Sequence, residues 1–250
     1  MYDYDRRVST MEMARRTIQF DTHHVTMFAA NLWEKALARI ERSIHSDHSI
    51  GEHASIQGDT LRLKDVRGEE KDISVTIGSR KTQSVQPTAG GDFKPSRYHG
   101  EGEITLYLNS EWTPAALKTE TYEVQKLLSS MLLHEVTHAL DVINENAEYQ
   151  RGRGTSTHEE QKEYFNQPLE IRAYAKQIVH EVLTSANVVR LEHRRSKRPM
   201  PTGAALVAEL LGRSKTWAKI EEFLTPANEK LIQQIVAREL QDANHAYPVG

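Results

Sequence analysis

The chain has 250 residues, of which 38% are hydrophobic and 27% are charged, and its formal net charge at pH 7 is −3. This length suits one domain of moderate size or a domain with an appended lobe, and so small a charge creates no general attraction for nucleic acid. Cysteine is absent, which excludes disulfides and a thiolate metal site.

The first residues contain no apolar signal region, and no run of the sequence approaches the ~18 apolar residues of a membrane span. We therefore expect a cytoplasmic protein, of the host cell if the chain is phage-encoded, with no membrane partner. Residues 1–53 are predicted to be a helical segment, because apolar side chains such as Val25, Leu32 and Ile40 recur on one face of residues 24–46.

Histidines 45, 48 and 53 follow this helix in a polar connection bounded by glycine. A solvated connection is the simpler interpretation, and a metal bound by these histidines is the less favoured alternative. His23 and His24 precede the helix, and as neighbours in sequence they point in different directions.

Residues 54–80 alternate between apolar and polar side chains and are interrupted by glycines, which predicts strands joined as a hairpin. Residues 83–102 contain four glycines and two prolines and are predicted to be an irregular loop. Residues 103–108 then form a short predicted strand. A sheet followed by helices predicts an α+β fold.

The segment that carries the chemistry lies in residues 115–150, which contain neither proline nor glycine and have apolar side chains at helical spacing. His134 and His138 are four positions apart there, so both imidazoles lie on one helix face and can reach the same metal ion. Glu135 follows the first histidine and is placed to hold a water molecule rather than to bind the metal. This is the HExxH arrangement of zinc metallopeptidases.

A catalytic zinc ion usually has three protein ligands and one open position. The longer motif with a third histidine is excluded, because Asp141 and Asn144 stand where it needs glycine and histidine. Glu170 is the best candidate for the third ligand: Pro168 suits the first turn of a helix, and the small Ala173 follows one turn after the glutamate.

Three alternatives to Glu170 as a ligand remain open. Glu170 can instead be a carboxylate that the helix dipole favours at an N-terminus. His158, in a polar stretch at residues 151–161 that is predicted to be a loop, and Glu163 are weaker ligand candidates.

Helical spacing continues in residues 168–187, 203–212, 215–223 and 226–243. The basic run at residues 190–199 is predicted to be a solvated linker rather than a nucleic-acid site, because no aromatic side chain interrupts the charges. These patterns predict an N-terminal segment 1–53, a catalytic core 54–187 and a helical subdomain 188–250. The alternative is that all three form one continuous domain.

Residues 134–138, followed by residues 166–173, resemble the gluzincin branch of the zincin-like metallopeptidases. More narrowly, they resemble small metallopeptidases predicted in phage and bacterial genomes. The resemblance covers about residues 100–185. It implies a small mixed or antiparallel sheet, then an active-site helix and a mainly helical C-terminal part, with Zn2+ held by His134, His138 and Glu170 and with Glu135 as the general base.

The resemblance also implies that strand 103–108 forms the sheet edge over the cleft and pairs with an extended substrate; a plain, covered strand is an equal alternative. The chain departs from the thermolysin pattern at Leu169, which stands where that pattern has asparagine. It departs again at Tyr174, which stands where an acidic residue is found. The side chain that orients His134 is therefore unassigned, with Asp141 as one candidate.

The expected function is zinc-dependent hydrolysis of peptide bonds in a protein or peptide substrate. Tyr174 is the first candidate for stabilising the oxyanion, one turn after Glu170, and Tyr164, Arg172 and His180 are further candidates. The alternative is a non-catalytic zincin-fold binding or structural module. Manganese, iron or cobalt fits the same ligands less well than zinc, and the oligomeric state is not predicted.

Overall fold

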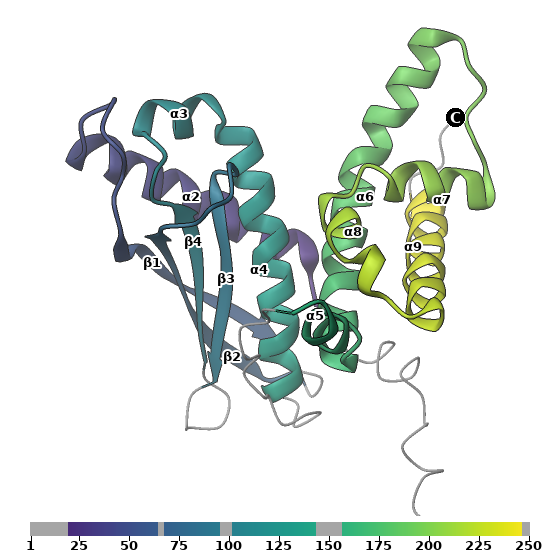
Figure 1. Ribbon diagram of the computed structural model, residues 1–250, viewed down its shortest axis with the longest axis horizontal. Coiled ribbons are helices and arrows are strands. Elements are labelled where there is room, and N and C mark those ends of the chain that lie inside the picture. Colours follow the sequence, from purple (N-terminus) through teal and green to yellow (C-terminus); the bar gives the residue numbers. More distant parts are fainter. Residues whose placement is uncertain (1–19, 65–67, 96–101, 144–156, 247–250) are drawn as a thin grey trace, which may run out of the picture. The chain divides into compact units, whose positions relative to one another are not determined.

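The computed structural model describes residues 20–64, 68–95, 102–143 and 157–246, and it divides into two compact units, Met1–Tyr149 and Gln150–Gly250 (Figure 1). The first unit contains a sheet and helices and the second is helical, so the α+β class is confirmed. This division differs from the three predicted segments, because the N-terminal helix belongs to the same unit as the sheet.

The first unit contains a four-stranded sheet in the order β1-β2-β4-β3. Its strands are β1 (His53–Lys64), β2 (Glu70–Arg80), β3 (Thr88–Pro95) and β4 (Gly102–Asn109). The central pair, β2 and β4, is parallel, while β1 with β2 and β3 with β4 are antiparallel. The sheet is therefore mixed, with β1 and β3 at its two edges.

The prediction of an irregular loop at residues 83–102 is wrong for residues 88–95, which form β3. Gly90, Gly91 and Pro95 hid this strand, because glycine and proline disfavour strands in general but are tolerated at an edge. The prediction of a strand at residues 103–108 is confirmed as β4. Of the two equal alternatives for its place, the sheet edge is wrong and the covered strand is confirmed, because β4 is paired on both sides, with β2 and with β3.

Helices α2 (Thr22–Ser43) and α4 (Thr121–Ile143) pack on one face of this sheet, and the short α3 (Pro114–Thr119) precedes α4. The predicted helix at residues 24–46 is confirmed as α2, with Asp21 capping its start by accepting a hydrogen bond from the backbone N–H of His24 at 3.1 Å. Helix α4 packs against both β3 and β4. The motif helix is thus supported by the edge strand and its neighbour.

The core of the first unit lies between the sheet and these helices. Alternate residues of the central strands are fully buried, which leaves the other sheet face polar or half-exposed. The central buried strand residues are Ile73, Val75, Ile77, Ile104, Leu106 and Leu108. They meet apolar side chains of α2 and α4 in a single cluster, which positions the middle turns of α4.

The second unit consists of helices. They are α5 (His158–Phe165), α6 (Pro168–Ser196), α7 (Gly203–Leu211), α8 (Lys215–Ile220), a 3-10 turn η2 (Glu221–Phe223) and α9 (Pro226–Ala246). Helices α7, α8 and α9 all pack against α6 or one another, around their own apolar cluster. The predicted helical segments after residue 167 are therefore confirmed.

Two predictions for the second unit are wrong. The loop predicted at residues 151–161 is wrong for residues 158–161, which begin α5, because Thr157 and Glu160 form a reciprocal capping box; residues 151–156 lie outside the described residues. The basic run is not a linker, since α6 continues through it to Ser196 and ends at Lys197 in the left-handed conformation. Positive charges in the last turn of a helix are favoured by its dipole, which accounts for the run without a bound anion.

Buried polar groups fasten the second unit together. The carboxylate of Glu181 in α6 accepts hydrogen bonds from the hydroxyls of Ser214 at 2.7 Å and Thr216 at 2.6 Å, at the start of α8. Asn166, between α5 and α6, donates to the carbonyl of Phe223 at 2.7 Å and accepts from the backbone N–H of Thr225 at 2.9 Å. These bonds hold the start of α6 against the turn before α9.

Among the described residues, no helix is both long and apolar enough to cross a lipid bilayer.

Trp33 provides a test of the α2–α4 contact, because its indole N–H donates to the hydroxyl of Thr121 at 2.8 Å and its ring is 1% exposed. We expect Trp33→Phe to lower the free energy of unfolding by about 1–3 kcal/mol, through the lost hydrogen bond and the smaller ring. Urea unfolding followed by circular dichroism measures this loss. Met27→Ala, on the exposed side of the same helix, is the control and should change stability by less than about 0.5 kcal/mol.

Candidate metal centre

The two motif histidines lie in the most buried stretch of α4, where every residue from Leu132 to Asp141 is buried. A helix that is buried on all sides is normally apolar all round, yet this one carries two imidazoles and two carboxylates. Burying such groups costs free energy unless each finds a partner. The stretch is therefore the first place to look for a ligand.

Within α4 the imidazoles of His134 and His138 converge. Their Nε2 atoms are 3.1 Å apart, and the rings meet edge to face with centroids 4.8 Å apart. Two nitrogen ligands at ~2.0–2.1 Å from a tetrahedral zinc ion are separated by ~3.3–3.4 Å. The observed separation is close to this value, so the pair can bind one metal ion with almost no movement.

A shared proton is the other chemistry that suits this spacing, because one imidazole N–H can donate to the second ring at the same distance. The two cases differ in what they require around the pair. A proton satisfies only the two facing nitrogens, whereas a metal ion has further coordination positions to fill. Metal content distinguishes them directly.

Glu135 lies against the edge strand of the sheet. A side-chain carbon added at Gly91 of β3 would stand 2.9 Å from Oε1 and 3.0 Å from Cγ of Glu135, closer than real atoms pack. Any side chain at position 91 would therefore require the Glu135 carboxylate to shift from its present place. Sequence reasoning missed this contact, because residues 83–102 were predicted to be a loop and Gly91 had no predicted partner.

The edge strand is irregular next to Glu135. Its pairing with β4 shifts between Thr88 and Gly90, and Gly90 has a φ of 106°, which an L side chain rarely adopts. Arg80 holds this bulge by donating to the carbonyl of Ala89 at 2.6 Å while its guanidinium lies 4.3 Å from the ring centroid of Tyr107. The backbone beside the candidate base is thus shaped by a specific bulge.

Asp141 is buried in the same helix, one turn after His138. Its predicted role in orienting His134 stays a prediction. It is the second carboxylate of the buried stretch and lies on the same unit as the histidine pair.

Glu170 lies in the second unit, in the first turn of α6, and is buried. The predicted role of Pro168 is confirmed, since it occupies the start of that helix. Tyr164 hydrogen-bonds to both Glu170 and Tyr174. Burial, followed by the neighbouring Tyr174 and Glu170, raises the pKa of the Tyr164 phenol far above its usual value. Glu170 is therefore hydrogen-bonded by a neutral phenol, and it also interacts electrostatically with the ammonium of Lys219.

The remaining candidates have different surroundings in the second unit. Tyr174 is buried, with its ring centroid 5.4 Å from that of Phe165. Arg172 is buried in α6, and His180 is half-buried two turns after Tyr174. Sequence reasoning ranked Tyr174 above Tyr164. In the structure, however, Tyr164 in α5 is the tyrosine that hydrogen-bonds to Glu170 in α6.

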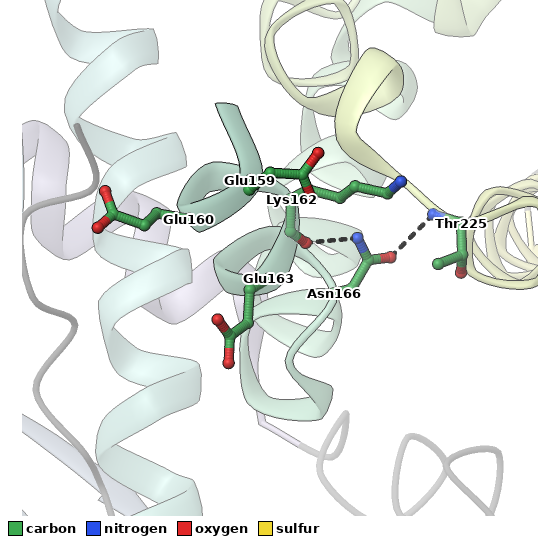
Figure 2. Close-up of a pocket in the computed structure, with 6 residues that line it drawn as sticks. All are labelled: Glu159, Glu160, Lys162, Glu163, Asn166 and Thr225. Atoms are coloured by element: carbon green, nitrogen blue, oxygen red, sulfur yellow. Dashed lines mark hydrogen bonds between the residues drawn. The ribbon is translucent and has the colours of Figure 1, made fainter. Parts of the chain in front are cut away.

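The two weaker ligand candidates are both exposed. His158 stacks on Phe223 with ring centroids 5.1 Å apart. Glu163 lines a shallow pocket of about 420 Å³, together with Glu159, Glu160, Lys162, Asn166 and Thr225 (Figure 2). Asn166 spans this pocket through its bonds to Lys162 and Thr225, and the carboxylate of Glu163 points away from it. The residues that line this pocket include no histidine, unlike the buried group His134, His138 and Glu170.

Comparison of the chain with family models, with curated proteins and with solved structures found no match.

The raised pKa of Tyr164 generates a pH prediction. In the folded protein the phenol stays neutral well above pH 10, whereas in the unfolded chain it ionises near its usual pKa of about 10. Unfolding is therefore favoured progressively as the pH rises above 10, and Tyr164→Phe should remove part of this loss of stability.

Tyrosinate absorbance at 295 nm, measured between pH 9 and 12, provides the readout. Folded wild type and Tyr164→Phe should gain the same absorbance up to the pH of unfolding, and the two should differ by one tyrosine after denaturation. A difference of one tyrosine while both are still folded would mean that Tyr164 titrates normally.

Proposed function

We propose that this chain is a zinc-dependent metallopeptidase of the zincin-like type, with His134, His138 and Glu170 as metal ligands and Glu135 as general base. The observation that carries the proposal is the pair of buried imidazoles in α4, with Nε2 atoms 3.1 Å apart, followed directly by a glutamate packed on an edge strand. Two nitrogens and one carboxylate oxygen are a usual ligand set for catalytic zinc.

The third proposed ligand, Glu170, belongs to the second unit. The side chains of His134, His138 and Glu170 are all buried and can form a group that holds a metal ion. Glu170 is more than a carboxylate favoured by a helix dipole, because Tyr164 orients it through a hydrogen bond from a different helix. Second partners of this kind fix the direction in which a ligand points.

When bound, a zinc ion in such a site lowers the pKa of a water molecule towards neutrality and polarises the substrate carbonyl. Glu135 then accepts the proton of the attacking water and delivers it to the leaving amine. Its packing against Gly91 holds the carboxylate in one place, which is what a general base requires. Tyr174, Arg172 and Tyr164 of α5 and α6 are the proposed donors to the oxyanion.

The substrate is proposed to be an extended peptide. We assign its binding edge to β3 in place of residues 103–108, since β4 is paired on both sides. An extended chain can add to an open edge strand through backbone hydrogen bonds, and β3 is the edge that contacts Glu135. The bulge at Gly90 interrupts regular pairing near the base, so the bonds to a peptide would be formed on the Gly91–Pro95 side.

The first test of this function is Glu135→Gln. We expect the variant to keep the zinc stoichiometry of the wild type, because glutamine keeps the shape of the side chain. Hydrolysis of a labelled casein or of a peptide library should fall by about 100-fold or more, because the proton acceptor is lost. Elemental analysis and a fluorescence assay measure the two quantities.

His138→Ala and Glu170→Gln are the companion variants, and each should lose one zinc equivalent as well as activity. Chelation should abolish hydrolysis, and added Zn2+ should restore it. Undiminished turnover in Glu135→Gln would remove the proposed base. A wild-type protein that binds zinc and cleaves no peptide would favour the non-catalytic module instead.

A second test is Gly91→Ala, which places a methyl group where the Glu135 carboxylate lies. We expect kcat/KM to fall by about 10- to 100-fold, because a displaced base is poorly aligned, while zinc content stays the same. Gly58→Ala in β1 is the matched control, since its added carbon would meet Thr76 at an ordinary 3.4 Å. Equal activity of the two variants would show that Glu135 does not need its contact with β3.

A further inference from the structure

The turn after α2 brings together a second set of metal-binding side chains in the first unit. His45, Asp47 and His48 each offer one ligand atom, and these atoms lie within 4.8 Å of one another. His45 Nδ1 contacts Asp47 Oδ1, and the two imidazole centroids are 5.3 Å apart. The sequence grouped His45 and His48 with His53, but His53 instead hydrogen-bonds to the carbonyl of Ile50 at 2.9 Å.

The backbone of this turn is held in place. The N–H of His48 donates to the carbonyl of His45 at 3.1 Å, which closes the turn. The carbonyl of Ser46 accepts from the N–H of Ala115 in α3 at 3.2 Å, and the N–H of Ile50 donates to the carbonyl of Trp112 at 2.8 Å. These backbone hydrogen bonds fix the turn, so the side chains of His45, Asp47 and His48 project from fixed and neighbouring backbone positions.

The donor spacing is close to what a metal ion requires. Two ligands at ~2.1 Å from one ion are at most ~4.2 Å apart, so donors that lie within 4.8 Å of one another need only a small inward movement. The side chains of His45 and Asp47 are 71% and 72% exposed, so rotation about their side-chain bonds meets little resistance. An exposed ion pair such as His45–Asp47 contributes little stability by itself. Pairing of these two charges therefore does not account for the presence of His48 beside them.

We propose that His45, Asp47 and His48 form a second, surface metal site that binds a first-row divalent cation such as Zn2+. Imidazole and carboxylate donors suit Zn2+, Ni2+ and Cu2+, and water molecules complete the coordination of a site with three protein ligands. The bound ion connects the end of α2 to the turn that leads into β1. This site is independent of the one in α4, which uses none of these residues.

The test is a calorimetric titration of the full-length protein with Zn2+ at pH 7.5. Wild type should bind one more equivalent than the double variant His45→Ala/His48→Ala, which replaces only exposed side chains and should fold normally by circular dichroism. His24→Ala removes an exposed histidine at the other end of α2 and is the matched control. It should keep the wild-type stoichiometry.

A second measurement separates this site from the proposed active site. In the His138→Ala background, added Zn2+ should raise the unfolding temperature, and the increase should vanish in the triple variant that also lacks His45 and His48. Equal stoichiometry in wild type and the His45→Ala/His48→Ala variant would overturn the surface site, whatever happens at His138. Loss of zinc in His138→Ala alone bears on the active site and leaves the surface site unaffected.

Discussion

The packing of α4 against the edge strand β3 is the constraint on which the candidate site depends. It buries two imidazoles and a glutamate among apolar side chains, where each polar group costs ~1–3 kcal/mol unless it is satisfied. The absence of a side chain at Gly91 gives the Glu135 carboxylate its position beside the strand. The fold therefore keeps these polar side chains in its core and places Glu135 next to an edge strand of the sheet.

In the second unit, the buried carboxylate of Glu170 is likewise fixed by its surroundings. Asn166 ties the start of α6 to the segment before α9, so the first turn of α6 has a defined place. Glu170 in that turn is then held by the phenol of Tyr164, whose ionisation is suppressed by burial. The ammonium of Lys219 also interacts electrostatically with Glu170, so within the second unit this carboxylate has both a neutral donor and a cation as neighbours.

Local patterns predicted some elements well and others not at all. Helices α2, α4 and α9 carry apolar side chains at helical spacing, so their sequences were sufficient. Strand β3 was missed because its glycines and proline resemble a loop, and its strand form depends on hydrogen bonds from β4. The extension of α6 through the basic run was missed because a run of charged residues shows little apolar periodicity in a short window.

The sequence alone determined that the two imidazoles converge, because the spacing of His134 and His138 on any helix puts both on one face. It also determined the start of α6 at Pro168, since proline suits a first turn. Only the tertiary structure decided which strand borders Glu135 and which tyrosine holds Glu170. It alone also separated His53 from His45 and His48. These contacts join residues far apart in sequence or depend on the path of a turn, and no local periodicity records either.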